Sequence, residues 1–178
     1  MNIFLGGVHG VGKSFLVNQV PASYGYLRTS ASSLIKEERL LPNWGVDKRV
    51  EGAAENQILL AEGVKRKNNE GIRLFLDGHF VLKGVQGDFI YLGVDVFSNL
   101  NLKAAILLEA DPHIIARRVL ERDGRTEGVE SLREFIEAEH MQAQQVCNAL
   151  DIPLAILNSP TLEEFLRMIE RLERGADI

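Results

Sequence analysis

Eight residues near the start of the chain, 7–14, have the types and spacing of a phosphate-binding loop. They follow the pattern GxxxxGK[ST], between a short apolar run and a segment of helical character. Glycines at this spacing let backbone amides turn inward, and the following helix adds the positive end of its dipole. The residues expected to bind nucleotide phosphates are Gly7, Gly10, Val11, Gly12, Lys13, Ser14 and Phe15. Lys13 would reach the β- and γ-phosphates, whereas His9 is expected to be solvated.

Two oxygen-bearing side chains are candidates to hold Mg²⁺ beside these phosphates. Ser14 ends the loop with a hydroxyl, and Asp77 closes the apolar run IRLFL. A phosphate-loop enzyme places a carboxylate at such a strand end to orient the metal. An aspartate at this position can also form a turn without binding metal, but the phosphate-binding loop in the same chain favours a metal-binding role for Asp77. His79 follows two residues later and is a candidate for lining an acceptor pocket.

The segment ADPHIIARRVLERDGR contains a group of arginines. Arg118 and Arg122 are four residues apart and would share one helix face, and Arg125 would lie in the loop beyond. Fixed guanidinium groups can stabilise the charge of a transferred phosphoryl group. The same arginines could equally form a solvated face, because Glu121 and Asp123 are available as partners. The local sequence leaves both readings open.

The composition is that of a compact domain. The 178 residues are 46% hydrophobic and 25% charged, and the net charge is -5. This charge gives no global basic field for nucleic acid or an anionic membrane, so anion binding must be local. The single cysteine, Cys147, excludes an internal disulfide and suits a reducing cytoplasm. The start MNIFLGGV lacks the basic region of a signal peptide, and no apolar run approaches the roughly 18 residues of a membrane span.

Strand and helix patterns alternate along the chain. Strands are expected at residues 2–5, 26–29, 72–80, 103–110 and 152–158, and a hairpin at 79–93 turned by 84–87. Helices are expected at 13–20, 30–41 and 47–67, after Pro112, at 131–150 and at 161–175, the last two beginning with capping boxes. Such alternation predicts an α/β fold, a parallel sheet covered on both faces. Ligands of these sheets bind at the carboxyl ends of the strands.

The ordered set of motifs resembles the adenylate kinase-like nucleoside monophosphate kinases, and most closely the archaeal-type adenylate kinases. The resemblance rests on the GxxGxGKS loop, LDGH, EADPHIIARR ending in RDGR, EGVESLREFIEAEH and ILN, and it covers almost the whole chain. It implies a P-loop NTPase fold, three-layer α/β/α with a five-stranded parallel sheet. It also implies an acceptor-binding helical segment at about residues 30–69, a short lid at about 122–129, and ATP with Mg²⁺.

The resemblance also assigns roles to single residues. The acceptor would be bound by Ser30, Ser33, Arg39, Arg49 and Gln57, next to His79, which its place near the strand end suggests for the same pocket. Lys13, Arg118, Arg122 and Arg125 would be catalytic and face the transferred phosphoryl group, and Asn158 would lie near the donor base. The chain departs from the family at Glu127 and at residues 144–145, where the family carries arginines, and at residues 32–33, where it carries Gly-Asp.

These patterns predict a cytoplasmic kinase that moves the γ-phosphoryl group of ATP to a nucleoside monophosphate or similar small acceptor. The alternative is a nucleotide-dependent regulatory P-loop ATPase that acts on a protein partner, and the missing arginines favour it. A kinase acting on a nucleic-acid end fits poorly with the net charge of -5. The identity of the acceptor and the oligomeric state are left open.

Overall fold

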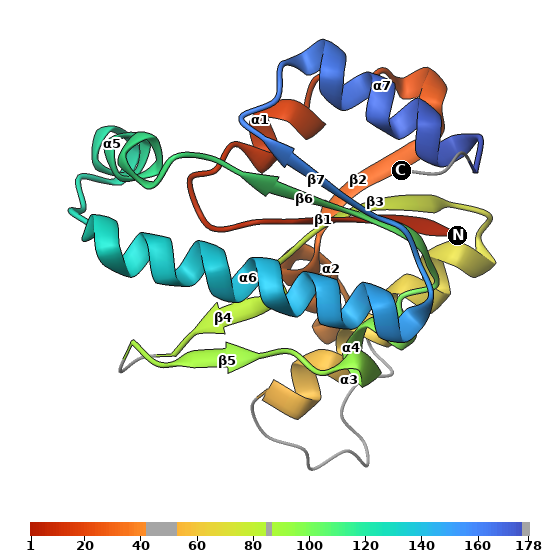
Figure 1. The fold of residues 1–178 in the computed structure, drawn as a ribbon. Coiled ribbons are helices and arrows are strands. Elements are labelled where there is room, and N and C mark those ends of the chain that lie inside the picture. Colours follow the sequence, from red (N-terminus) through yellow and green to blue (C-terminus); the bar gives the residue numbers. More distant parts are fainter. Residues whose placement is uncertain (42–52, 85–86, 176–178) are drawn as a thin grey trace.

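A parallel sheet covered by helices on both faces forms the body of the protein (Figure 1). The computed structural model describes residues 1–41, 53–84 and 87–175. The five strands are β1 (Asn2–Gly6), β2 (Tyr26–Ser30), β3 (Arg73–Asp77), β6 (Leu102–Glu109) and β7 (Leu154–Asn158), in the order β2-β3-β1-β6-β7. All neighbouring strands are parallel. The predicted five-stranded α/β architecture is therefore confirmed.

The register of the sheet brings separate motifs to one edge. Leu5 of β1 pairs with Asp77 of β3, and Gly6 pairs with Leu107 of β6. The loop after β1, the carboxylate at the end of β3 and the helix that follows β6 therefore start from the same edge of the sheet. This is the edge at which open parallel sheets bind ligands.

Helices form the outer layers. They are α1 (Lys13–Val17), α2 (Ala31–Arg39), α3 (Ala53–Asn69), α4 (Val94–Ser98), α5 (Pro112–Asp123), α6 (Val129–Leu150) and α7 (Leu162–Glu173), with a short 3₁₀ turn η1 at Ala22–Tyr24. In Figure 1, α1 and α7 cover one face of the sheet, and α2, α3 and α6 lie on the other. No helix within the described residues has the length and apolar character needed to cross a membrane.

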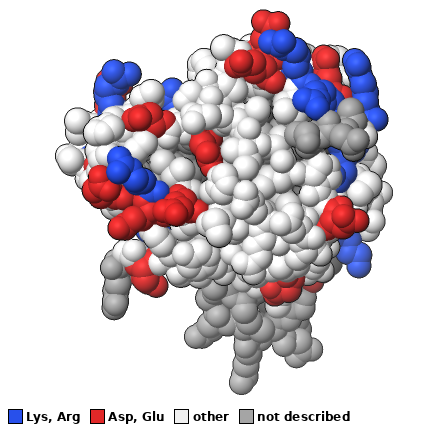
Figure 2. Space-filling model, in the orientation of Figure 1, with Lys and Arg blue, Asp and Glu red and all other residues white. Residues whose placement is uncertain are grey.

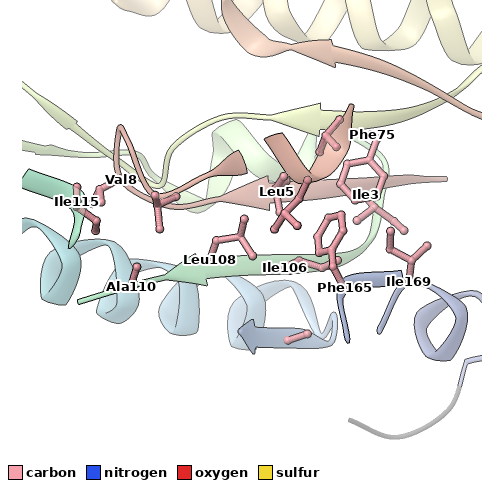
Figure 3. Packing of buried hydrophobic residues seen from close by; sticks show 14 of the residues in the cluster. Ile3, Leu5, Val8, Phe75, Ile106, Leu108, Ala110, Ile115, Phe165 and Ile169 are labelled. Carbon is pink, nitrogen blue, oxygen red and sulfur yellow. The ribbon is translucent and has the colours of Figure 1, made fainter. Parts of the chain in front are cut away.

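The core lies on both faces of the central strands because strand side chains alternate between faces. Ile3 and Leu5 of β1 point to one face, where Phe165 and Ile169 of α7 complete a buried cluster (Figure 3). Phe4 points to the opposite face and belongs to a second cluster with residues of α2, α3, α4 and α6. Strands β1, β3 and β6 are mainly apolar because both of their faces are buried, whereas β2, at the edge of the sheet, has no buried residue.

Two local predictions need correction. The first helix ends at Val17 rather than at residue 20, because Gln19 and Val20 bond to carbonyls three residues back and so tighten the chain before Pro21. The capping box expected to start a helix at residue 131 is wrong: α6 begins at Val129 after Gly128, and the Ser131 hydroxyl instead accepts from Lys83. The box at residues 161–164 is confirmed.

The expected hairpin is present and stands apart from the main sheet. Strands β4 (Val81–Lys83) and β5 (Phe89–Tyr91) pair with each other alone, and the ring of Phe89 stacks on Phe135 of α6 with centroids 5.3 Å apart. Helix α4 follows the hairpin and had not been predicted. Residues 47–52 of the long helix predicted at 47–67, including Arg49, lie outside the described residues.

Candidate functional site

The loop between β1 and α1 has positive φ angles at Gly7, Gly10 and Gly12, and at the first two positions there is also no room for a side chain. Gly7 and Gly10 have φ values of 134° and 83°. A Cβ on Gly7 would lie 2.5 Å from the carbonyl oxygen of Leu108, and one on Gly10 would lie 2.7 Å from the side chain of Val119. No side chain caps the start of α1 at Gly12. The backbone of the loop can therefore approach a phosphate closely, as its sequence predicts.

Lys13 lies inside this loop, with a side chain that is only 8% exposed. Its ammonium group donates to the carbonyl oxygens of Gly7 and Val8, and it lies 3.8 Å from Oδ1 of Asp77. Burial lowers the pKa of Lys13, and the negative charges of Asp77 and Glu139 partly oppose that effect. The amine is therefore held by backbone oxygens and a carboxylate at the position where a phosphate would lie.

Asp77 ends β3 and faces the loop. Burial raises the pKa of its carboxyl group. The charge of Lys13 and a hydrogen bond with the Ser14 side chain lower this pKa and so partly oppose the effect of burial. Ser14 and Asp77, predicted as a metal pair, thus lie together and offer a hydroxyl and a carboxylate oxygen. This donor set fits Mg²⁺, which is usually bound through few protein oxygens, waters and substrate phosphates. No group of three or more His, Cys, Asp or Glu ligands occurs within the described part of the chain.

The predicted arginine cluster divides in the structure. Arg118 donates to the carbonyl oxygen of Val11 at 2.9 Å, so α5 holds a guanidinium group against the loop. Arg122 contacts the ring of His9 and pairs with Asp123 at 2.7 Å. Arg125 is exposed between α5 and α6, and it has no hydrogen bond or ion pair within the described residues. Of the three predicted arginines, Arg118 and Arg122 therefore lie beside the loop, and Arg125 does not.

A cavity of about 760 Å³ opens beside the loop and extends beneath α2, α3, α4 and the β4–β5 hairpin. The predicted site residues that line it are Gly10, Gly12, Lys13, Ser14, Phe15, Ser30, Gln57, Asp77, His79, Arg118 and Arg122. Those in the described ranges that do not line it are Gly7, Val11, Ser33, Arg39, Arg125 and Asn158. The cavity therefore joins most of the predicted phosphate-binding residues to part of the predicted acceptor-binding segment.

Two of the predicted acceptor residues have other partners. Ser33 bonds through its amide to the Ser30 hydroxyl, which caps α2. Arg39 donates to Asn56 at 2.9 Å and lies 3.6 Å from Glu55, so its guanidinium group bridges α2 and α3. Both interactions stabilise the helical segment, and neither Ser33 nor Arg39 lines the cavity.

A histidine–glutamate pair at the cavity had not been predicted as a unit. Nδ1 of His79 lies 2.9 Å from Oε1 of Glu139, and the Phe80 amide donates to Oε2 of the same carboxylate at 2.8 Å. Glu139 is 1% exposed and comes from the buried face of α6. Its position on the apolar stripe between Phe135 and Ala143 is the signal that could have identified it, because buried carboxylates need partners.

The acidic and basic side chains elsewhere are mixed. On the face drawn in Figure 2, Lys and Arg stand in small groups beside Asp and Glu, without an extended basic area. The lysine and arginines that line the cavity, Lys13, Arg118 and Arg122, lie at or beside the loop.

A family model and several solved structures match most of this chain. A family model described as an AAA domain (AAA_17) matches residues 6–135. No curated protein gives a significant match. A gluconokinase from Sinorhizobium meliloti superposes with a TM-score of 0.57 at 14% identity, covering 98% of this chain and 93% of the gluconokinase. A sugar kinase from a Janibacter species gives a TM-score of 0.59 at 14% identity, covering 97% and 94% of the two chains. An uncharacterised protein from Eubacterium ventriosum gives a TM-score of 0.56 at 13% identity, and the match covers 98% of this chain and 98% of that protein.

Proposed function

The chain belongs to the AAA domain family, and from this premise we propose that it is an ATP-dependent phosphotransferase that acts on a small molecule. Its P-loop NTPase-like fold matches the solved kinases over nearly the full length. The proposed reaction moves the γ-phosphoryl group of ATP to an acceptor, with Mg²⁺, in the cytoplasm.

The continuity of the cavity carries this proposal. Lys13, Asp77 and Arg118 lie at one end, and Gln57 of α3 and Tyr91 of β5 lie at the other, within a single space of about 760 Å³. A protein that only binds or hydrolyses a nucleotide needs the first end alone. A second compartment that opens directly onto the phosphate loop is what a group-transfer enzyme needs to place two substrates in line.

The residues at the loop supply charge for such a transfer. Lys13 would bind the β- and γ-phosphates, and Arg118 and Arg122 would stabilise the charge that spreads over the transferred group. Ser14 and Asp77 would hold Mg²⁺, which neutralises phosphate charge. The chemistry then requires positioning and charge stabilisation rather than a covalent intermediate.

The acceptor class is the open part of this proposal. The resemblance to archaeal-type adenylate kinases suggests a nucleoside monophosphate, and the names of two structural neighbours suggest a sugar or sugar acid. The regulatory ATPase remains the alternative and predicts turnover that does not depend on any acceptor.

An ADP-release assay with Mg-ATP tests the proposal. The purified protein is assayed with nucleoside monophosphates, with sugars and with neutral alcohols, beside a control without acceptor. Acceptor-dependent ADP release, with a phosphorylated product detected by mass spectrometry, supports the phosphotransferase. Equal ADP release with and without every acceptor would contradict it and support the ATPase.

A further inference from the structure

We propose, on the basis of the phosphotransferase activity above, that His9 and Asp123 are positioning residues for Arg122. Together they hold its guanidinium group beside the phosphate loop, with one end left to bind the transferred phosphoryl group. Three observations lead to this inference. They are the packing of α5 along the loop, the contacts along one edge of the guanidinium group, and the place of Asp123 at the end of the helix.

One face of α5 lies directly on the phosphate loop. A Cβ on Gly10 of the loop would lie 2.7 Å from the side chain of Val119, so the helix and the loop backbone are in close contact. Arg118 donates to a carbonyl oxygen of the loop at 2.9 Å. Arg122 lies one helical turn further along the same face and contacts the ring of His9. The helix therefore brings a guanidinium group to the loop from a firmly packed position.

Two side chains bind the same edge of the Arg122 guanidinium group. Nε and Nη2 donate to the two carboxylate oxygens of Asp123, at 2.8 Å and 2.7 Å. Nη2 also contacts Nε2 of His9, and this ring nitrogen lies 3.4 Å from Oδ2 of Asp123. Because a guanidinium group only donates hydrogen bonds, Nε2 of His9 accepts, and the ring carries its proton on Nδ1. A residue of the loop and a residue of the helix thus fix the orientation of one arginine.

These contacts leave the other terminal nitrogen of Arg122 for a ligand. Nη1 has no hydrogen-bond partner within residues 1–41, 53–84 and 87–175. Arg122 and His9 both line the cavity, whereas Asp123 does not. The N–H groups of a guanidinium group bind phosphate oxygens well when the group is held in a fixed orientation. An arginine held in this way before the substrates arrive stabilises the charge of the transferred group without first having to be ordered.

The place of Asp123 in α5 supports a positioning role. It is the last residue of the helix, and Gly124 follows with a φ of 66°. A carboxylate at the carboxyl end of a helix meets the negative end of the helix dipole, which is unfavourable. Asp123 nevertheless uses both of its oxygens on Arg122, and the hydrogen bond from Arg122 lowers the pKa of Asp123 to about 2. The carboxylate therefore keeps its charge and its hold on the guanidinium group at neutral pH.

A double-mutant cycle in the ADP-release assay with Mg-ATP tests the inference. His9→Leu keeps a similar volume and removes the accepting nitrogen, so kcat should fall about tenfold while the KM for ATP stays within about twofold. Arg122→Ala should lower kcat about 100-fold. In the Arg122→Ala background, His9→Leu should have no further effect, because His9 acts only through Arg122. Asp123→Asn, which removes the charge that holds Nε, should behave as His9→Leu does in both backgrounds.

One rescue variant and one control accompany the cycle. His9→Gln keeps an oxygen that can accept from Arg122, so its kcat should stay within about threefold of wild type. His113→Leu replaces an exposed histidine of the same helix that does not line the cavity, and it should leave kcat unchanged. All of these variants should unfold cooperatively on heating, as the wild-type protein does.

The outcomes separate this inference from the proposed function. A wild-type kcat for His9→Leu would overturn the inference, and so would a tenfold loss that persists in the Arg122→Ala background. Either result would leave an acceptor-dependent phosphotransferase standing. ADP release that needs no acceptor would overturn the proposed function, and the same cycle, measured on that rate, would still decide whether His9 positions Arg122. A wild-type protein that releases no ADP under any condition would overturn both.

Discussion

The ammonium nitrogen of Lys13 lies 3.8 Å from Oδ1 of Asp77. Lys13 follows β1 and Asp77 ends the neighbouring strand β3. Burial shifts both pKa values toward the neutral forms, downward for Lys13 and upward for Asp77, and mutual attraction opposes both shifts. The phosphates of a nucleotide and a bound Mg²⁺ would each add the charge that stabilises one of the partners. Binding of a nucleotide and Mg²⁺ would therefore favour the charged forms of both residues.

Replacing Lys13 by alanine should lower kcat/KM about 100- to 1000-fold, because a positioned charge at the transferring phosphate is lost. Circular dichroism and cooperative thermal unfolding should be retained, since the side chain faces the cavity. Lys65→Ala, at an exposed position of α3, is the matched control and should keep wild-type activity. Equal rates for Lys13→Ala and wild type would refute the assignment of the loop.

Asp77→Asn should weaken the dependence of turnover on Mg²⁺ more than it weakens binding of metal-free ATP. The amide keeps the shape and removes the charge that binds the metal. Because the pKa of Asp77 is raised, wild-type Mg²⁺ affinity should begin to fall on acidification at a higher pH than an exposed aspartate would cause. Calorimetric titrations of both proteins measure this, with Asp151→Asn as the control. Identical Mg²⁺ titrations for wild type and Asp77→Asn would leave Asp77 as a turn residue.

The two ends of the arginine cluster should differ in kinetics. Arg118→Ala should lower kcat about 10- to 100-fold with little change in ATP affinity, because Arg118 lines the cavity and is held by the Val11 carbonyl. Arg125→Ala should remain within about twofold of wild type, because Arg125 is exposed outside the cavity. A larger loss for Arg125→Ala than for Arg118→Ala would show that the loop after α5 closes over the substrate during turnover.

Features set by local sequence were predictable. The central strands β1, β3 and β6 are mainly apolar runs between turn signals, and the phosphate loop is a continuous motif whose glycines are required by local backbone angles. The approach of Lys13 to Asp77 followed from one rule, that parallel strands end at the same edge.

Features that depend on packing between distant elements were not predictable. Arg39 was expected at the acceptor, but the register of α2 against α3 places it beside Asn56. The tie between His79 and Glu139 joins residues 60 positions apart and depends on how α6 crosses the sheet. Helix α4 has only five residues, too few for helical periodicity to be visible in the sequence.

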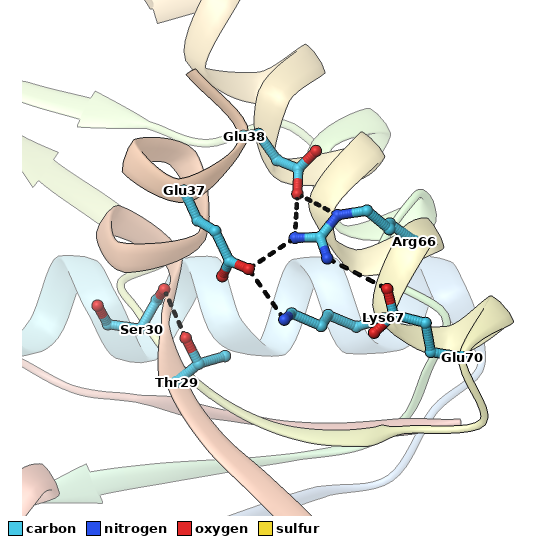
Figure 4. Close-up of polar contacts among 7 residues, drawn as sticks. All are labelled: Thr29, Ser30, Glu37, Glu38, Arg66, Lys67 and Glu70. Carbon is cyan, nitrogen blue, oxygen red and sulfur yellow. Dashed lines mark hydrogen bonds and ion pairs between the residues drawn. The ribbon is translucent and has the colours of Figure 1, made fainter. Parts of the chain in front are cut away.

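Arg66→Ala should destabilise the fold by about 2 kcal/mol, since it leaves the buried carboxylate of Glu38 without its partner. The same change removes contacts to Glu37 and Glu70 (Figure 4). Urea unfolding gives the free energy, and Lys65→Ala on the same helix should change it by less than about 0.5 kcal/mol. A change of that smaller size for Arg66→Ala would mean that Glu38 finds another partner or water.

The contribution of Glu37 to stability should depend on pH in one direction. Hydrogen bonds from Lys67 and then Arg66 lower the pKa of Glu37, so the folded state favours the carboxylate. A carboxyl group with a lowered folded pKa stabilises the fold above its unfolded pKa and loses that effect as the pH falls through the folded value. Glu37→Gln should therefore be less stable than wild type at pH 7, and the two curves should converge below about pH 4, under the usual glutamate pKa. Urea unfolding at several pH values measures the difference, and a gap that stays constant down to pH 3 would contradict the assigned ion pairs.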